Sequence, residues 1–317
     1  MTKSSLTERI KALALESGFD KVGVSPASLL SNRESDLENW LHQGFAAQMN
    51  YMIRDGLKRA RPKEVMPHAR SVISLALNYY TPDEKKGGDG IFGKIARYAR
   101  GKDYHRIIEK KLKRLIKAIR EITHESVGLK PYVDTGPIME KAFAQQAGIG
   151  FYGKNTTILT RDLGSWIFLA NVITDLELDF DQPDLGSCGS CRICLDECPT
   201  GALVAAYELD ARKCISYWTI ESKEAIPDQI ASQMGDLVFG CDICQDVCPV
   251  NRRPKVSSEP GFAAQEGKGT WLELNSVMSL ENDEAFQKQF QGTPLKRAKR
   301  SGLIRNAKAV LKNLVNN

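Results

Sequence analysis

Seven of the eight cysteines stand in two short runs, and each run closes with Cys-Pro. The first run has the spacing C-x2-C-x2-C-x3-C-P, which is typical of thiolates that bind iron–sulfur clusters. The second run has only three cysteines, because Val238 stands where a leading cysteine would be. Cys214, between the runs, can supply the missing ligand. The spacing therefore predicts two clusters of the 4Fe-4S type, each bound by four thiolates.

The order of the cysteines predicts how the two clusters share them. In ferredoxin-type runs the fourth cysteine binds the other cluster. For the first cluster we expect the ligands Cys188, Cys191, Cys194 and Cys248. For the second cluster we expect the ligands Cys198, Cys214, Cys241 and Cys244. This crossover would tie the two runs together, so that each cluster also staples the small domain that binds it.

Two other uses of the thiols compete with this interpretation. A disulfide framework is typical of small secreted proteins, whereas this chain has 317 residues and shows no secretory leader pattern. Structural zinc also binds four thiolates, but it requires neither a third thiol three residues further on nor the Cys-Pro ending. The spacing favours iron–sulfur clusters, and reduced cysteines without a leader predict a cytoplasmic protein.

Positive charge gathers in two stretches, although the net charge is only +5. Residues 94–120 carry eleven Lys or Arg against two acids, and the stretch from Lys288 to the end carries eight and no acid. A basic stripe is the electrostatic signature of a nucleic-acid-binding surface. The apolar spacing of Ile108, Leu112 and Leu115 equally allows the first stretch to be an amphipathic helix whose lysines only face solvent.

Apolar periodicity and chain breaks predict three segments. Residues 1–180 are expected to form an α/β domain, 181–255 a small ferredoxin-like domain with both clusters, and 256–317 a helical segment. Strands are expected at 71–80 and 165–174, and helices at 6–17, 34–53, 105–126 and 137–147. The last helix has an apolar face that needs a partner, so it could begin a set of HEAT-like repeats. No apolar run approaches the roughly 18 residues of a membrane span, so we expect no membrane partner.

The loop GIGFYGKN (148–155) comes close to two nucleotide-binding motifs and satisfies neither. G-x-G-x-x-G is present, but a helix is expected before it, where the dinucleotide motif needs a strand. G-x-x-x-x-G-K is also present, but Asn155 replaces the hydroxyl that would bind magnesium. A flexible loop that carries Lys154 and Asn155 could still wrap another large, amide-rich cofactor.

Two motifs that begin with an aspartate lead to different expectations about catalysis. Asp103-Tyr104-His105 begins the D-x-H-x-x-G loop that supplies a cobalt ligand in some cobalamin enzymes, but Ile108 occupies the glycine position, so no such ligand is expected. Asp134 begins a D-T-G tripeptide, and no second copy exists to complete an aspartic-protease pair. Asp134 follows a short β-like stretch and precedes a helix, which suits a carboxylate for acid–base work. A plain turn or an N-cap aspartate fits the same position.

Together these motifs resemble the epoxyqueuosine reductase family. The matching segments follow one another over most of residues 50–250: RYARGKDYH (97–105), DTGPIMEKAFAQQAGIGFYGKN (134–155), CGSCRICLDECPTGAL (188–203), CISYWTIE (214–221) and GCDICQDVCP (240–249). The resemblance implies a cobalamin-dependent iron–sulfur oxidoreductase that converts epoxyqueuosine to queuosine at the wobble position of tRNA. It also implies a relation to reductive dehalogenases and, in many members, helical repeats that help to bind tRNA.

The resemblance further implies the cofactors and the roles of single residues. Cobalamin would bind base-off, without a protein axial ligand, beside two 4Fe-4S clusters that a flavodoxin- or ferredoxin-type donor charges. The inner cluster would reduce cobalamin to Co(I). Asp134 would lie at the cofactor and donate a proton to the departing oxygen, while Arg97, Lys154, Ser216 and Asp242 would contact the cofactor. The protein would act as a monomer, with its basic stretches on the tRNA phosphates.

Three alternative functions keep some of these features and drop others. A corrinoid iron–sulfur reductase of a small molecule, such as a dehalogenase, is typically exported with a twin-arginine leader, a pattern that does not occur here. A two-cluster electron carrier would leave about 180 N-terminal residues without a function. A tRNA-binding scaffold with purely structural clusters would predict clusters that do not respond to reductant.

Overall fold

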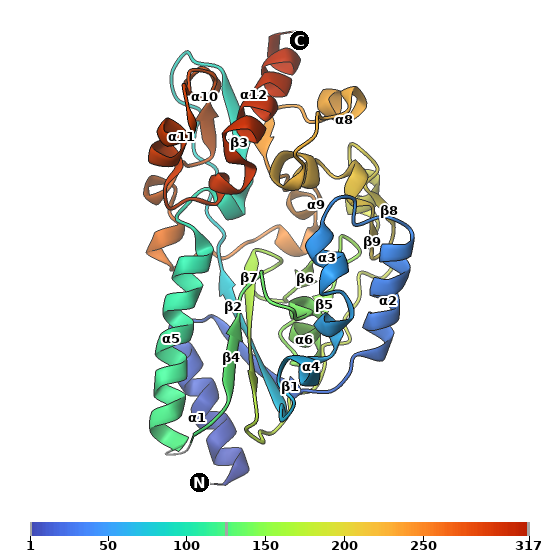
Figure 1. Ribbon diagram of the computed structural model, residues 1–317, viewed down its shortest axis with the longest axis vertical. Coiled ribbons are helices and arrows are strands. Elements are labelled where there is room, and N and C mark those ends of the chain that lie inside the picture. Colours follow the sequence, from blue (N-terminus) through green and yellow to red (C-terminus); the bar gives the residue numbers. More distant parts are fainter. Residues whose placement is uncertain (1, 124–125, 316–317) are drawn as a thin grey trace. The chain divides into compact units, whose positions relative to one another are not determined.

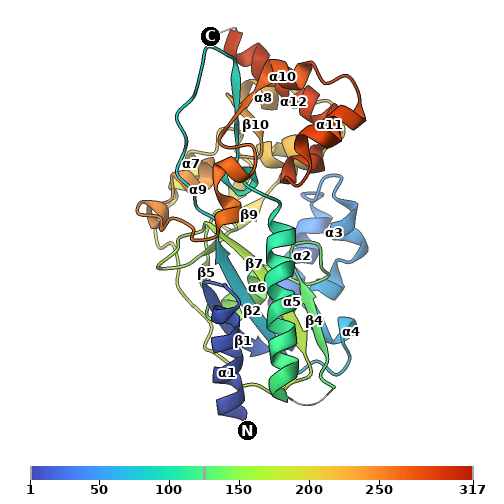
Figure 2. The same cartoon turned by 90° about the vertical axis from the view of Figure 1, so that its left-hand side faces the viewer.

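The computed structural model describes residues 2–123 and 126–315, and the chain forms two compact units (Figures 1 and 2). The first unit consists of Met1–Ala46, Asn50–Asn78 and His105–Cys191, and the second of Ala47–Met49, Tyr79–Tyr104 and Arg192–Asn317. This division differs from the three expected segments. Residues 79–104 belong to the second unit because strand β3 (Phe92–Ile95) pairs with β10 (Leu237–Phe239) and β11 (Trp271–Glu273). The C-terminal helices share one core with the cysteine-rich part, so residues 192–317 form a single body.

An antiparallel sheet in the order β1-β2-β7-β4 lies at the centre of the first unit. Its strands are β1 (Lys21–Pro26), β2 (Ser71–Asn78), β7 (Ile167–Thr174) and β4 (Leu129–Tyr132). Because this sheet is antiparallel, the expected α/β domain is an α+β arrangement. All eight residues of β2 are buried, which requires cover on both faces and explains why the strand reads as a continuous apolar run.

The first unit also contains six α-helices among the described residues: α1 (Lys3–Glu16), α2 (Ser31–His42), α3 (Asn50–Arg54), α4 (Pro62–Val65), α5 (Tyr104–Thr123) and α6 (Glu140–Gln146). A short hairpin is formed by β5 (Phe151–Tyr152) and β6 (Ile158–Leu159). Helix α6 packs on β1, β2 and β7, where Phe143 lies in one apolar cluster with Val72 and Ile173. Helices α1 and α5 run along the sheet in both views (Figures 1 and 2).

The predicted helix at 34–53 is wrong in its middle. The structure has α2 up to His42 and α3 from Asn50, with Gly44 and Ala47 between them at φ values of 69° and 51°. These left-handed residues end the helical path. The helix expected at 105–126 extends in part beyond the described residues. In the described ranges, no helix is long and apolar enough to cross a membrane.

The second unit combines a small sheet, several short helices and the C-terminal helices. The sheet has the order β10-β3-β11, and β8 (Leu203–Ala205) pairs with β9 (Glu208–Leu209). The helices are α7 (Ile193–Asp196), α8 (Asp228–Gln233), α9 (Ile243–Asp246), α10 (Leu274–Met278), α11 (Asp283–Phe290) and α12 (Lys299–Val315). A π-helical turn at Tyr217–Glu221 follows Cys214.

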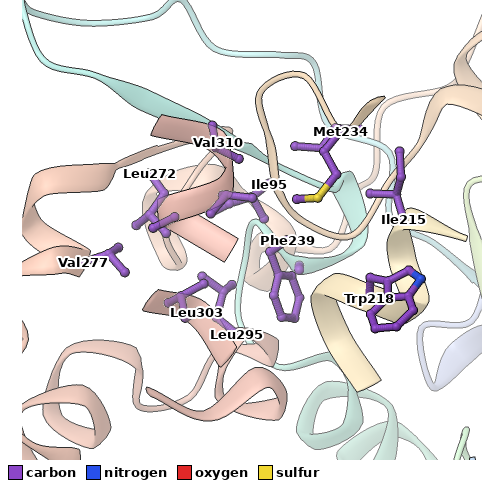
Figure 3. Close-up of a cluster of buried hydrophobic side chains, with 14 of the residues drawn as sticks. Ile95, Ile215, Trp218, Met234, Phe239, Leu272, Val277, Leu295, Leu303 and Val310 are labelled. Carbon is purple, nitrogen blue, oxygen red and sulfur yellow. The ribbon is translucent and has the colours of Figure 1, made fainter. Parts of the chain in front are cut away.

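One apolar core holds the second unit together, and Figure 3 shows its centre. Ile95 of β3 and Phe239 of β10 lie in this core with Leu303 and Val310 of α12, and all four are fully buried. The apolar face of the last helix is therefore covered within this unit. An additional helical repeat is not required to cover it.

Candidate functional site

The four thiols expected at the second cluster all lie in the second unit and act on one another electrostatically. Burial raises the pKa of Cys214, that of Cys241 to about 12, and that of Cys244 well above its usual range. The charge of Cys198 adds to the increase at each of the three, and Cys241 and Cys244 are also raised by Cys214. Such thiols ionise together only where a bound cation neutralises them, because a coordinated thiol loses its proton outright. This donor set fits an iron–sulfur cluster.

A cubane cluster makes a different demand on its ligands from a single metal ion. In the part of the chain that the structure describes, no group of three His, Cys, Asp or Glu side chains could hold one metal ion. In a cubane each thiolate binds its own iron corner, so the four sulfurs need not converge on one point.

Buried polar side chains fix the backbone on both sides of this thiol set. Asn306 of α12 is fully buried, and its amide group donates to the carbonyls of Thr219 in the π-helical turn (2.8 Å) and Val238 in β10 (3.0 Å). The Thr219 hydroxyl accepts the N–H of Gly240 at 2.9 Å, next to Cys241. One helix thus connects the segment after Cys214 to the segment before Cys241. We expect these contacts to set the spacing of the two sulfurs.

Lys154 connects the glycine-rich loop to the first cysteine run within the first unit. Its ammonium group donates to the carbonyls of Gly189 (2.7 Å) and Cys191 (2.8 Å), and its backbone N–H donates to Sγ of Cys188 (3.5 Å). Hydrogen bonds to ligating sulfurs and nearby positive charge tune the potential of a cluster. The family resemblance implies a contact between Lys154 and the cobalamin, whereas in the structure the side chain of Lys154 donates to the cysteine run.

The remaining two ligands expected for the first cluster belong to the second unit. Cys194 lies in α7, and Cys248 stands two residues after the end of α9 and is buried. Each cysteine run thus continues into a one-turn helix, which matches the tight thiolate turns expected from the Cys-Pro endings.

Asp134 lies on a strained turn between β4 and α6. Its φ is 57°, and the N–H of Thr135 donates to the carbonyl of Val133 across it (2.6 Å), which defines a three-residue γ-turn. Its side chain is 59% exposed, and Oδ2 lies 3.3 Å from Nε2 of His105 in the first turn of α5. Helix α6 begins only at Glu140, so Asp134 is not an N-cap residue. Strain at a non-glycine residue is typical of functional positions.

Glu140 contacts the same turn through the main chain. Its Oε1 accepts the N–H of Asp134 at 2.9 Å. Burial of this carboxyl, followed by the charge of Asp134, raises the pKa of Glu140 to about 8, although Lys141 and His105 act in the opposite direction. Around neutral pH, Glu140 therefore keeps its proton in most molecules.

Arg97 and Asp242, two of the expected cofactor contacts, are buried and paired with groups of the second unit. The Arg97 guanidinium donates from Nη1 to Asp246 (2.9 Å), from Nη2 to Asp83 (2.5 Å) and from Nε to a backbone carbonyl. Asp242 Oδ2 accepts the N–H of Arg97 at 2.6 Å, and burial raises the pKa of Asp242 to about 6. Ser216 is half-buried and hydrogen-bonds to the thiol of Cys214. All of these predicted contact residues therefore have partners in their own unit.

The sequence alone indicates no role for Glu140, and it offers His105 only as a metal ligand, in a motif that Ile108 breaks. His105 lies 29 residues before Asp134, and the link appears only when α5 and the end of β4 come together. Glu140 stands six residues after Asp134, and nothing in its local pattern distinguishes it from an ordinary first-turn glutamate.

Known proteins match both the sequence and this arrangement. Residues 59–135 match the family model "Epoxyqueuosine reductase QueG, DUF1730", and residues 187–251 match "4Fe-4S double cluster binding domain". The chain is 43% identical to the epoxyqueuosine reductase of Cellulophaga algicola over 310 residues, which cover 96% of this chain and 98% of that protein. The chain belongs to the epoxyqueuosine reductase family. It is also 42% identical to the epoxyqueuosine reductase of Synechocystis sp. over 294 residues, or 92% of this chain and all of that protein.

Solved epoxyqueuosine reductases share the fold. A crystal structure of epoxyqueuosine reductase with a tRNA-Tyr epoxyqueuosine-modified tRNA stem loop superimposes with a TM-score of 0.90 at 30% identity, covering 98% of this chain and 81% of that one. The epoxyqueuosine reductase of Bacillus subtilis, with an aspartate-bearing catalytic loop swung out of the active site, gives a TM-score of 0.87 at 29% identity and covers 98% of this chain and 82% of that one. As a family member, the chain is an oxidoreductase of tRNA queuosine biosynthesis, as the resemblance implied.

Proposed function

We propose that this chain reduces epoxyqueuosine to queuosine at the wobble position of tRNA, with Asp134 as the proton donor. The observation that carries the assignment of Asp134 is its geometry: a strained γ-turn presents an exposed carboxyl group next to an imidazole. The tRNA stem-loop complex of a relative supports the substrate, and the loop of the Bacillus subtilis enzyme supports a catalytic aspartate on a movable segment.

The reaction defines what the side chains must do. Converting the epoxide to the alkene consumes two electrons and two protons and releases water. In the proposal, Asp134 donates one proton to the departing oxygen, because a neutral leaving group departs far more readily than an oxyanion. His105, at 3.3 Å from Oδ2, orients the carboxyl group and can return a proton to it after turnover. The second proton comes from solvent.

The cofactors supply the electrons. Two 4Fe-4S clusters, on the two sets of cysteines given above, and base-off cobalamin would provide a path for single electrons and a strongly reducing cobalt centre. The physiological donor would be a flavodoxin- or ferredoxin-type protein. The four side chains expected to contact the cofactor all have hydrogen-bond partners within their own units: Arg97, Asp242, Lys154 and Ser216. We therefore propose that their main role is to fix the backbone around the cofactor, and that direct bonds to the corrin amides are secondary.

The exposed face of α5 is the proposed surface for tRNA phosphates. Apart from buried Lys111, its lysines and arginines lie opposite the buried residues Ile108, Leu112, Leu115 and Ile119, so the helix is amphipathic as predicted. The exposed cations are Arg106, Lys110, Lys113, Arg114, Lys117 and Arg120. The C-terminal basic stretch would add contacts. We further propose that the enzyme is a cytoplasmic monomer.

Replacing Asp134 with asparagine tests the proposed role directly. We expect Asp134→Asn to retain about eight irons per chain and its affinity for the epoxyqueuosine stem-loop. We also expect kcat to fall by about two orders of magnitude or more, the usual contribution of a positioned acid. Turnover is measured by nucleoside mass spectrometry after anaerobic reduction. Full activity of Asp134→Asn would remove Asp134 as the acid.

Electron paramagnetic resonance with added cobalamin separates the proposed enzyme from an electron carrier. In the proposed enzyme, a base-off Co(II) signal appears on binding and disappears with dithionite. Clusters that are reduced without any change at cobalt would favour the electron carrier instead.

A further inference from the structure

The turn that presents Asp134 costs free energy that its surroundings must offset. A left-handed φ of 57° at a residue with a Cβ, inside a three-residue turn, is a rare and strained conformation. Asp134 is also largely exposed, so apolar packing of its side chain does not hold it in place. Specific hydrogen bonds to the main chain have to do so.

Two side chains make such main-chain bonds within the segment 134–139. Buried Arg59 donates from Nη1 to the carbonyl of Gly136 (3.0 Å), two residues after Asp134, and its own carbonyl accepts the N–H of Met139 (2.9 Å). The carboxyl of Glu140 accepts the N–H of Asp134 itself (2.9 Å). Arg59 thus fixes the end of the segment that leads into α6, and Glu140 acts on the reactive residue itself.

Glu140 is well placed for this role because α6 holds its backbone. It is the first residue of α6, whose buried residues Ala142, Phe143 and Ala144 anchor the helix in the first unit. The carboxyl group therefore reaches back over the turn from a rigid base. Either protonation form of this group offers an oxygen to the N–H of Asp134, so the bond persists across neutral pH.

We propose that Glu140 is a positioning residue for Asp134: it holds the strained turn in the conformation that presents the Asp134 carboxyl to the substrate. The inference rests on the proposed role of Asp134 as proton donor. It predicts that loss of the Glu140 acceptor releases the turn, so that the carboxyl group of Asp134 samples positions from which it cannot transfer its proton. The expected defect lies in the chemical step and leaves substrate binding unchanged.

The test compares Glu140→Ala with Glu140→Gln, and Glu121→Ala on α5 serves as an exposed control in the same unit. Glu140→Ala should lower kcat at least tenfold, with KM, iron content and thermal stability close to wild type. Glu140→Gln should restore most of the activity, because its amide oxygen can accept the same N–H. Hydrogen exchange should show faster exchange at the amide of residue 134 in Glu140→Ala only.

The outcomes separate this inference from the proposal on which it rests. If Asp134→Asn is inactive while Glu140→Ala keeps full kcat, Glu140 does not position Asp134, but Asp134 remains the proton donor. If Asp134→Asn is active, the acid itself is wrong, whatever Glu140 does. Equal losses in Glu140→Ala and Glu140→Gln would also overturn the inference, because a hydrogen-bond acceptor would then not be what matters.

Discussion

The turn at Asp134 and the π-helical turn at Tyr217–Glu221 are both irregular backbone beside a reactive group, yet they are held in opposite ways. Ionisable groups surround the first: the exposed carboxyl of Asp134, the imidazole of His105 and the half-buried carboxyl of Glu140. The main chain of the second is held by the Asn306 amide and the Thr219 hydroxyl, both fully buried, and by the guanidinium of Arg305, which donates to the carbonyl of Trp218. Chemistry that moves protons needs the first kind of support, and a site that only carries electrons is better served by the second.

The difference also concerns how much each region can move. A buried carbonyl without its partner costs about 1–3 kcal/mol, so the bonds of Asn306 resist opening. The bond from Asp134 to Glu140 is a single hydrogen bond nearer to solvent, so opening it costs less than breaking the two bonds of Asn306. The turn can therefore open during a catalytic cycle, while the spacing of the second thiol set stays constant.

The largest predicted effect comes from removing the bonds of Asn306, which hold the π-helical turn and β10 together. Asn306→Leu should leave the carbonyls of Thr219 and Val238 unsatisfied, at a cost of about 2–6 kcal/mol, and the protein should lose iron from the second cluster. Iron content and anaerobic urea unfolding measure this. Asn313→Leu is the matched control, because Asn313 lies on the same helix and also donates to two carbonyls, those of Ala231 and Gly235, at a less buried place. An equal effect of both variants would contradict the special role of Asn306.

A smaller effect is expected at Lys154, which should change the reduction potential of a cluster without being one of its ligands. Lys154→Met removes a positive charge and two hydrogen bonds from the first cysteine run but leaves the backbone N–H on Cys188. Since positive charge stabilises the reduced, more negative cluster, one of the two clusters should shift to a lower potential in a redox titration followed by electron paramagnetic resonance. Lys130→Met, which removes a lysine bond to the carbonyl of Val65 far along the sequence from the cysteines, should leave both potentials unchanged. A shift in neither variant would favour Lys154 as a direct corrin ligand instead.

The smallest effect is expected on the surface of α5. Lys113→Ala with Lys117→Ala should weaken tRNA binding at low salt and lower the slope of log Kd against log salt by about one for each phosphate that is no longer neutralised. The control pair Lys3→Ala with Arg70→Ala removes two cations that pair with Glu177 in the same unit. Fluorescence anisotropy with a labelled stem-loop compares them. Identical slopes would mean that the α5 lysines serve only as a solvated face.

Local patterns in the sequence predicted α1, α5 and α6, the strands β2 and β7 and the amphipathic nature of α5, because the spacing of apolar residues along the chain follows the period of each element. They did not predict the break between α2 and α3. The family assignment followed from motifs with fixed spacing and is confirmed by relatives of nearly equal length. The cluster ligands and the role of Asp134 stay predictions. The contacts of Glu140, His105 and Lys154 could not be predicted, since each depends on tertiary structure that brings separate segments together. For the same reason the sequence did not predict that residues 79–104 belong to the second unit, because β3 pairs with strands far along the chain.

That displaced strand has a consequence for how the protein is made on the ribosome. β3 leaves the exit tunnel early, but β10 and β11, its pairing partners, are translated much later. At translation rates of about 5–20 residues per second, both edges of β3 remain without their pairing strands for on the order of ten seconds. Neither unit is one continuous stretch of chain, so the core of the second cannot close until β11 and α12 have been translated. On the proposed assignment of the cysteines, iron loading follows that step, and chaperones have a defined interval in which to shield β3.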